Sequence, residues 1–334
     1  MRIVALEEHF SFPALQSRID PALVIKRGYP PPHLPSVRPD VDAKLEDFGE
    51  GRLNSLDANG ISLQVLGPSG PGADLLPPSE GPAFARELND ALAAQIAKQP
   101  KRYAGYAHLP LTAPDAAADE LERCVTKLGF HGCMVNGSTD DVFLDDPRFE
   151  PVLARAEALD VPIYVHPGIP QKAVRDAYYG GLPGPIPTIF ARAGYGWHAE
   201  TAVHILRMAL SGTLDKHPKL KLIIGHQGEG LPAMMERFQE SYAGVVPKFL
   251  QRAPAQAIFD QVHITCAGFY SLPSFKMLIE VFGVDKIMFS VDYPFSSNEP
   301  ARKFLDALPI SAEDKAKIAH GNAEKLLKVR PEQK

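Results

Sequence analysis

Polar side chains that commonly bind metals stand at the ends of several apolar stretches in this 334-residue chain. The first are Glu7 and His9, which follow the apolar run 2–6. On a strand, residues two apart point to the same face, so these two side chains are expected side by side, with Glu8 facing the other way. Both are good ligands for a divalent metal. Taken alone, the pair is more often a surface glutamate beside a core histidine.

Comparable side chains recur where later apolar runs end. They are Asn136, His166, His226 and Asp292. A single histidine at a strand end is more often structural, but the set as a whole is harder to explain that way. Two histidines and two carboxylates form a mixed nitrogen and oxygen ligand set that suits Zn²⁺ or Mn²⁺. A third histidine is then left for proton transfer.

The alternation of apolar runs and amphipathic stretches predicts how these side chains are held. Strands are predicted at 2–6, 61–66, 103–108, 132–135, 161–165, 220–225, 262–265 and 286–290. Helices are predicted at 52–59, 82–98, 113–128, 147–159, 199–211, 231–243, 271–282, 300–307 and 312–327. Eight strand–helix repeats favour the α/β class, as a single-domain (β/α)8 TIM-like barrel over residues 1–334, with the active site at the carboxyl ends of the strands. The Pro-rich segments 11–50 and 167–197 are expected to be long loops that cover this site.

Composition excludes several other classes of protein. The formal net charge is -5 and no basic stretch is present, which argues against nucleic acid as a partner. No apolar run approaches the roughly 18 residues that a membrane span needs, and no secretory signal pattern is seen. The three cysteines, Cys124, Cys133 and Cys266, lack CxxC spacing. Buried thiols in a reducing cytoplasm are therefore expected.

Six stretches carry a specific resemblance to a known family. They are ALEEHF, LGFHGCMVNG, DVPIYVHPG, HAETAVHILRM, LIIGHQGEGLPAMMERF and FSVDYPF, and they span nearly the whole chain. With these the sequence resembles the amidohydrolase superfamily, in the branch that contains the aromatic-acid decarboxylases. The Glu-x-His element at Glu7 and His9 is typical of that branch, whereas many relatives have His-x-His.

The resemblance implies a role for each of these positions. Glu7, His9, His166 and Asp292 would ligate one divalent metal. Asn136, which stands where binuclear relatives carry a carboxylated lysine, would bind substrate. Asp292 would also be the proton donor, His226 an acid/base or substrate-polarising group, and Glu229 the residue that orients His226. Arg237 would touch substrate or a neighbouring subunit, and the family likeness suggests a homodimer or homotetramer.

The function implied is a metal-dependent, non-oxidative decarboxylase of a hydroxybenzoate-like aromatic acid, a lyase of aromatic catabolism. The substrate would chelate the metal, Zn²⁺ or Mn²⁺, through its carboxylate together with an ortho phenolic oxygen. No organic cofactor is expected, because the phenol itself accepts the electrons.

Two alternatives stay open. One is a hydrolase or hydratase that uses the same ligands and a metal-bound water. The other is a barrel that serves only as a binding or scaffold protein.

The sequence also departs from the branch after the fifth predicted strand, where it reads Pro167-Gly168-Ile169-Pro170. Trp197 and Phe295 could line an aromatic pocket, although loop packing explains each equally well.

Overall fold

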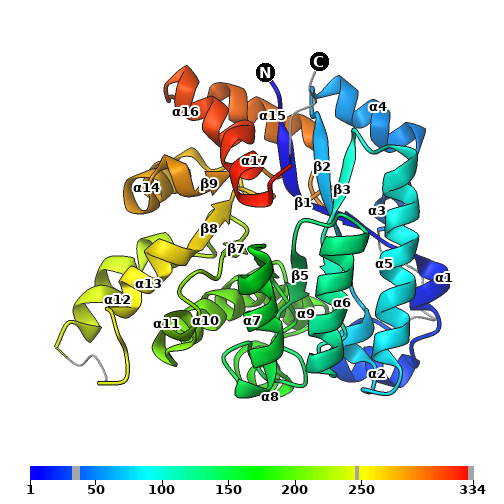
Figure 1. The fold of residues 1–334 in the computed structure, drawn as a ribbon, viewed down its shortest axis with the longest axis horizontal. Coiled ribbons are helices and arrows are strands. Elements are labelled where there is room, and N and C mark those ends of the chain that lie inside the picture. The colour runs from blue at the N-terminus through cyan, green and yellow to red at the C-terminus, as the bar shows by residue number, and fades with distance from the viewer. Residues whose placement is uncertain (32–37, 245–247, 330–334) are drawn as a thin grey trace.

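Parallel strands form a barrel surrounded by helices in the computed structural model of the chain (Figure 1), as the sequence predicts. The structure describes residues 1–31, 38–244 and 248–329. Within them the strands are β1 Val4–Phe10, β2 Leu63–Pro68, β3 Tyr103–Gly105, β4 Ala107–His108, β5 Cys133–Asn136, β6 Ile163–His166, β7 Leu222–Ile224, β8 Val262–Thr265 and β9 Ile287–Met288. Because β3 and β4 are separated only by Tyr106, they form one staggered barrel strand, and the predicted set of eight is confirmed.

The seam between the last and first strands is closed differently from the others. Consecutive strands pair in parallel from β1 to β3 and from β4 to β9. Between β9 and β1, in the described residues, no ladder pair occurs. Instead the His9 N–H donates to the Tyr293 carbonyl at 2.6 Å, and the Glu7 N–H donates to Ser290 Oγ at 2.7 Å. The seam therefore depends on the same short segments that carry the polar residues of the site.

The helices lie on the outside of the barrel, and they include all those that the sequence predicts, together with two that it does not. They are α4 Glu50–Ala58, α5 Gly81–Lys98, α6 Pro114–Lys127, α7 Glu150–Leu159, α10 Gly196–Leu210, α11 Thr213–Lys216, α12 Met235–Tyr242, α13 Pro254–Gln261, α14 Leu272–Phe282, α15 Asn298–Ala307, α16 Ala312–Ala316 and α17 Asn322–Leu327. In α6 the residues Ala117, Leu121 and Cys124 recur at helical spacing and are buried, as an amphipathic helix against a sheet requires. No helix in the described ranges is long and apolar enough to cross a membrane.

The two segments expected to be loops contain short helices, which corrects the sequence prediction. Within 11–50, of which 32–37 lie outside the described residues, the structure has α1 Pro13–Gln16, α2 Pro21–Arg27 and α3 Pro39–Glu46. Residues 167–197 contain α8 Lys172–Val174, a π-helical turn Arg175–Tyr179 and α9 Ile186–Ala191. The proline content pointed to loops, but Pro is favoured in the first turn of a helix, where its missing N–H is not needed. α1, α2 and α3 each begin in this way. The helix α13 also begins at a proline, and the sequence analysis did not predict it.

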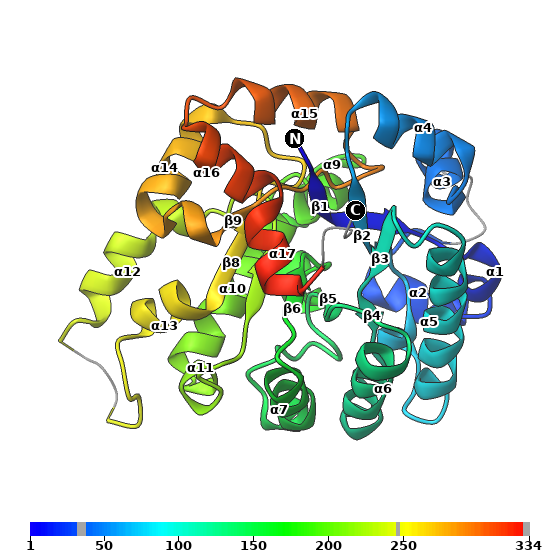
Figure 2. The same ribbon diagram turned by 45° about the horizontal axis from the view of Figure 1, so that its top comes forward.

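The barrel interior is filled by side chains from most of the strands and closed at one end by α17. One buried cluster joins inward-facing residues of the strands to residues of α17; its members are Val4, Leu6, Leu63, Val65, Ala104, Tyr106, Met134, Tyr164, Ile223, Met288, Ala323, Leu326, Leu327 and Val329. α17 lies beside the amino-terminal ends of β1 and β9, and Figure 2 shows it across the ring of strands. Functional side chains are therefore confined to the opposite, carboxyl-terminal mouth.

A bulge in β1 decides which side chains enter that mouth. Ala5 pairs with Gln64, but the next pairs are Glu8 with Leu66 and His9 with Gly67, so β1 has one extra residue. Val4 and Leu6 face the barrel interior, and strict alternation would send Glu8 there next. The extra residue reverses the alternation and turns Glu7 and His9 inward instead. The predicted split of Glu7 and His9 from Glu8 is thus correct, although the strand continues to Phe10 rather than ending at residue 6.

The helix that closes the barrel provides a first test. Leu327→Ala removes a side chain that is 2% exposed in the interior cluster. We expect the free energy of unfolding to fall by about 2–5 kcal/mol. Urea denaturation followed by circular dichroism measures this, with the exposed neighbour Lys325→Ala as control. Equal effects of the two substitutions would contradict the closing role of α17.

Candidate metal centre

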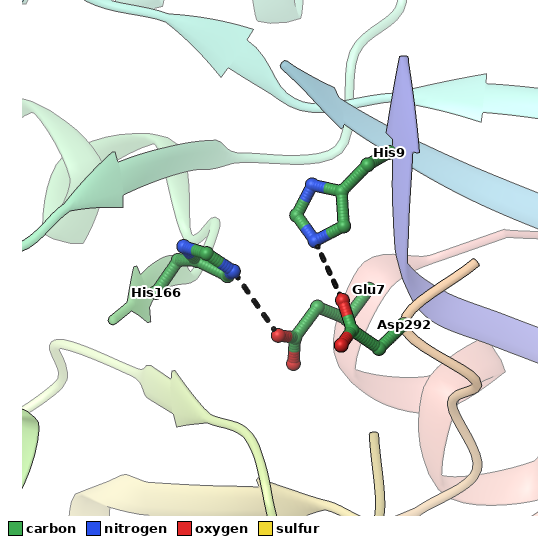
Figure 3. A group of neighbouring side chains, drawn as sticks. All are labelled: Glu7, His9, His166 and Asp292. Carbon is green, nitrogen blue, oxygen red and sulfur yellow. Dashed lines mark ion pairs between the residues drawn. The ribbon is translucent and has the colours of Figure 1, made fainter. Parts of the chain in front are cut away.

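Four side chains from three strand ends converge at the carboxyl-terminal mouth (Figure 3). Glu7 and His9 come from β1, His166 is the last residue of β6, and Asp292 follows β9. One ligand atom from each lies within 4.8 Å of the others. His9 Nε2 is 3.2 Å from Asp292 Oδ1, and His166 Nε2 is 3.3 Å from Glu7 Oε1. The structure therefore brings together all four residues that the sequence assigned to the metal.

Glu8 holds the segment that carries Asp292. The Glu8 carboxylate accepts hydrogen bonds from the Val291 N–H at 2.9 Å and the Tyr293 N–H at 3.2 Å. It also accepts from Ser290 Oγ at 3.2 Å and Gln64 Nε2 at 3.1 Å. Asp292, between two of these donors, has φ 68°, a left-handed conformation that a non-glycine residue seldom adopts. Glu8 thus fixes a strained backbone turn and closes the seam of the barrel.

Burial sets the protonation of the ligand atoms. Glu7 is completely buried, and this raises its pKa to about 7, with the His226 imidazole opposing the rise and Asp292 adding to it. Burial also lowers the pKa of His166 well below its ordinary value, helped by the neighbouring His9 and His226. His166 is therefore neutral, which is the state in which an imidazole binds a metal.

The pattern of unpaired atoms fits a cation. Glu7 Oε1 and His9 Nε2 are buried and have no hydrogen-bond partner among the described residues. A buried carboxylate oxygen without a partner is costly. Two ligands bound to one ion at about 2.1 Å are separated by roughly 3–4 Å, close to the distances found. The donor set of two imidazoles and two carboxylates therefore suits one divalent cation.

The other oxygen of Glu7 is held in place. Glu7 Oε2 accepts a hydrogen bond from the Tyr164 hydroxyl, which is also 2.8 Å from Thr265 Oγ1. Gly225 lies against the same carboxylate, and a Cβ there would collide with it. The backbone thus leaves room for Glu7 to point into the mouth, while Tyr164 fixes its rotamer.

His226 and Glu229 form the second part of the site. The turn after β7 has positive φ at each of residues 226–230, including the non-glycine residues His226, Gln227 and Glu229. This left-handed path brings His226 Nδ1 to 2.7 Å from Glu229 Oε1 and His226 Nε2 to 3.6 Å from Glu7 Oε1. The predicted orienting contact between Glu229 and His226 is therefore present in the structure.

The four predicted substrate-binding residues differ in their positions. Asn136 pairs with His166 across β5 and β6, so it stands at the level of the site. The Phe295 ring lies edge-on to the His9 ring, with centroids 5.4 Å apart. Arg237 lines a cavity of about 910 Å³ beside His226, but its side chain is 77% exposed and pairs with Glu240. Trp197 is not among the residues that line this cavity.

His198 is a site residue that sequence reasoning missed. It stands in the first turn of α10, and its Nδ1 lies 2.6 Å from Glu229 Oε2. The sequence contained a His three residues after a Tyr at the end of a long irregular segment, and nothing there indicated which way α10 would face. The contact joins residues 31 positions apart, so only the fold reveals it.

Comparisons with known proteins agree with this barrel fold. Residues 9–329 match the amidohydrolase family, and the chain belongs to that family. A gamma-resorcylate decarboxylase from Rhizobium sp. (strain MTP-10005) is 36% identical over 340 residues, covering 98% of each chain.

Two solved structures are also similar. A dihydroxybenzoic acid decarboxylase from Polaromonas sp. JS666, with bound manganese and the inhibitor 2-nitroresorcinol, has a TM-score of 0.86 and 33% identity, covering 99% of this chain and 98% of its own. A 5-carboxyvanillate decarboxylase from Sphingomonas paucimobilis has a TM-score of 0.89 and 31% identity, covering 98% and 99%. All three of these relatives are decarboxylases of aromatic acids, as expected from the sequence.

The unpaired oxygen of Glu7 gives a test of the metal centre. In Glu7→Gln the charged ligand becomes a neutral amide. We therefore expect the Mn²⁺ affinity to fall by more than the roughly 10- to 100-fold that is typical when a residue in contact with a metal ligand is substituted. Titration calorimetry of metal-free protein with Mn²⁺ measures the affinity, and elemental analysis gives the stoichiometry. Glu299→Gln, on the exposed face of α15, is the control. Unchanged binding by Glu7→Gln would remove Glu7 from the ligand set.

The seam gives a second test. Glu8→Gln replaces one acceptor oxygen by an amide that faces N–H donors, so buried donors lose their partner. We expect a loss of about 1–3 kcal/mol in the free energy of unfolding. Urea denaturation of the metal-free variant measures the loss, with the exposed Glu46→Gln as control. A variant as stable as the parent would show that the Glu8 contacts do not close the seam.

Proposed function

We propose that this protein is a metal-dependent, non-oxidative decarboxylase of a hydroxybenzoate-like aromatic acid, a carbon–carbon lyase. The observation that carries the proposal is the convergence of Glu7, His9, His166 and Asp292 within 4.8 Å, with a buried Glu7 oxygen that lacks a partner among the described residues. Membership of the amidohydrolase family, with aromatic-acid decarboxylases as relatives, supports the same assignment.

These four residues would hold one divalent cation, and the manganese bound in the Polaromonas relative makes Mn²⁺ the first candidate. When bound, the cation supplies Lewis-acid stabilisation for the carboxylate and an adjacent phenolic oxygen of the substrate. We include no organic cofactor in the proposal, since a phenol ring can itself accept the electron pair of the breaking bond.

Asp292 is our candidate for proton delivery. Its side chain is 18% exposed, compared with 0% for Glu7 and 1% for His9, so it is far more accessible than the β1 ligands to a molecule in the mouth. Asp292 would donate its proton to the ring carbon that bears the carboxylate. The carbon–carbon bond then breaks, its electron pair stays with the ring, and CO₂ leaves.

His226 would bind or polarise the substrate from the other side. Glu229 holds its ring by Nδ1, so Nε2 points toward the metal centre. We place Asn136 and Phe295 at the substrate, because both stand beside the ligand histidines. Trp197 stays a proposal based on its aromatic side chain, and Arg237 one based on the family likeness. The exposure of Arg237 favours a contact with a neighbouring subunit.

We further propose that segments 11–50 and 167–197 cover the site of a single domain. In support, α2 and the chain after β6 contact one another. Arg27 donates to the carbonyls of Ile169 and Ser138, and Arg192 donates to the carbonyl of Gly28. The two segments are therefore bound together on the side of the barrel where β5 and β6 end.

A homodimer or homotetramer is also proposed. Met234 and Phe249 are 56% and 64% exposed, and large apolar side chains are commonly covered in oligomers. Light scattering after size-exclusion chromatography would measure the oligomeric state.

The cysteines Cys124, Cys133 and Cys266 are free and buried, which supports the proposed cytoplasmic location.

The central test is turnover. The Mn²⁺-loaded protein is incubated with a panel of dihydroxybenzoates, and CO₂ release is measured. We expect release from an acid with a phenolic group ortho to the carboxylate, and loss of turnover in Asp292→Asn with the melting temperature retained. Cleavage of lactones or amides without CO₂ release would instead favour a hydrolase or hydratase. Near-native turnover in Asp292→Asn would contradict its role as proton donor.

A further inference from the structure

The Glu229 carboxylate is shared between two imidazoles, of which the family resemblance accounted for one. Oε1 lies 2.7 Å from His226 Nδ1, and Oε2 lies 2.6 Å from His198 Nδ1. The Glu229 side chain is fully buried, while His226 and His198 are 8% and 16% exposed. His198 therefore connects the first turn of α10 to the turn that follows β7.

The protonation of this group follows from the charges around it. Burial by itself would raise the pKa of Glu229, but the facing His226 and His198 bring it below its ordinary value. An ionised carboxylate can only accept hydrogen bonds. Each Nδ1 therefore carries a proton and donates a hydrogen bond to Glu229. His226 Nε2 is left pointing at the metal centre, 3.6 Å from Glu7 Oε1.

The rings are also packed together. The centroids of His198 and His226 are 4.8 Å apart, and Phe269 lies edge-on to both, at 5.0 and 5.4 Å. The contact thus has a hydrogen-bonding part and a ring-packing part. A substitution can remove either one while it keeps the other.

The same three residues have the spacing of a cation site, since one ligand atom from each lies within 4.8 Å of the others. Their hydrogen bonds argue against that use. Both Nδ1 atoms already face separate oxygens of Glu229 at 2.6 and 2.7 Å, so a cation would have to displace two short charge-assisted bonds. The two hydrogen bonds to Glu229 explain the arrangement without an added ligand.

We propose that His198 is a positioning residue, which holds Glu229 in the orientation that presents His226 Nε2 to the metal centre. This rests on the proposed function, because it assigns His226 a part in that reaction. His198 acts through Glu229 and performs no chemical step itself. Because α10 begins at Gly196, the same contact anchors the end of segment 167–197 to the turn that carries His226.

Two substitutions separate the two parts of the contact. His198→Asn keeps an N–H donor near the position of Nδ1 but loses the ring, whereas His198→Phe keeps a ring but loses the donor. We expect kcat to fall by about 10- to 100-fold in His198→Phe, as is typical when a partner behind a site residue is lost. KM and Mn²⁺ stoichiometry should stay near the parental values, and His198→Asn should recover most of kcat. Should His198→Phe fail to fold, His198→Ala takes its place.

A readout that does not depend on turnover completes the test. In Zn²⁺-loaded protein labelled with ¹⁵N-histidine, nuclear magnetic resonance reports the protonation of each ring nitrogen of His226. We expect the Nδ1–H signal in the parent and in His198→Asn, and an altered signal in His198→Phe. The control is His320→Asn, which removes another partly exposed histidine paired to a glutamate, Glu324, at 3.0 Å and away from the site.

The proposal is overturned if His198→Phe retains kcat and leaves the His226 signal unchanged. It is also overturned if His198→Asn and His198→Phe lose kcat equally, because the ring rather than the hydrogen bond would then matter. If the parent releases no CO₂ from any phenolic acid, the proposed function fails. The resonance comparison still decides the role of His198 in that case.

Discussion

Two adjacent glutamates, both completely buried, impose the main physical constraint on this barrel. Glu7 and Glu8 point to opposite sides of β1, and each carboxylate must be compensated where it lies. Glu8 is compensated by the protein, through two backbone N–H groups, a serine hydroxyl and a glutamine amide. Glu7 is compensated only on one oxygen, by Tyr164, and among the described residues its other oxygen faces three histidines and Asp292 without a hydrogen bond. Of this pair, Glu8 is thus satisfied by the fold, and Glu7 is left with an oxygen for the proposed cation.

This division explains why the seam of the barrel lies beside the site. A continuous ladder between β9 and β1 would place Ser290 to Tyr293 in regular strand geometry, and Asp292 would then alternate in or out with the pleat. The hydrogen bonds of Glu8 instead hold this stretch in an irregular path, with Asp292 in a left-handed conformation. The hydrogen bonds that Glu8 accepts from Ser290, Val291 and Tyr293 take the place of the missing ladder. The contacts that close the barrel between β9 and β1 are therefore the same contacts that position Asp292.

Much of this was accessible from the sequence, and the remainder has identifiable causes. Apolar runs revealed the strands because both faces of a parallel barrel strand are buried, and strand ends revealed Glu7, His9, His166 and Asp292 because the mouth gathers the carboxyl ends of strands. The β1 bulge was not predictable, since one extra residue leaves the apolar pattern of so short a strand almost unchanged. The short helices in 11–50 and 167–197 were hidden because Pro marks both loops and first helical turns. His198 was hidden because its partner, Glu229, lies on another element.

The location of each residue also separates two mechanical roles. Glu7, His9 and His166 stand on paired strands, where neighbouring ladders limit their movement. His226, Glu229 and Asp292 stand on left-handed turns, where backbone strain has to be offset by contacts with other elements. Glu8 supplies such contacts for Asp292, and His198 supplies one for the turn of His226 and Glu229. The paired strands thus suit Glu7, His9 and His166, which would bind a cation. The turns, stabilised by contacts with other elements, suit His226 and Asp292, which would move a proton. Glu8 and His198 stand where they can supply these stabilising contacts to the two turns.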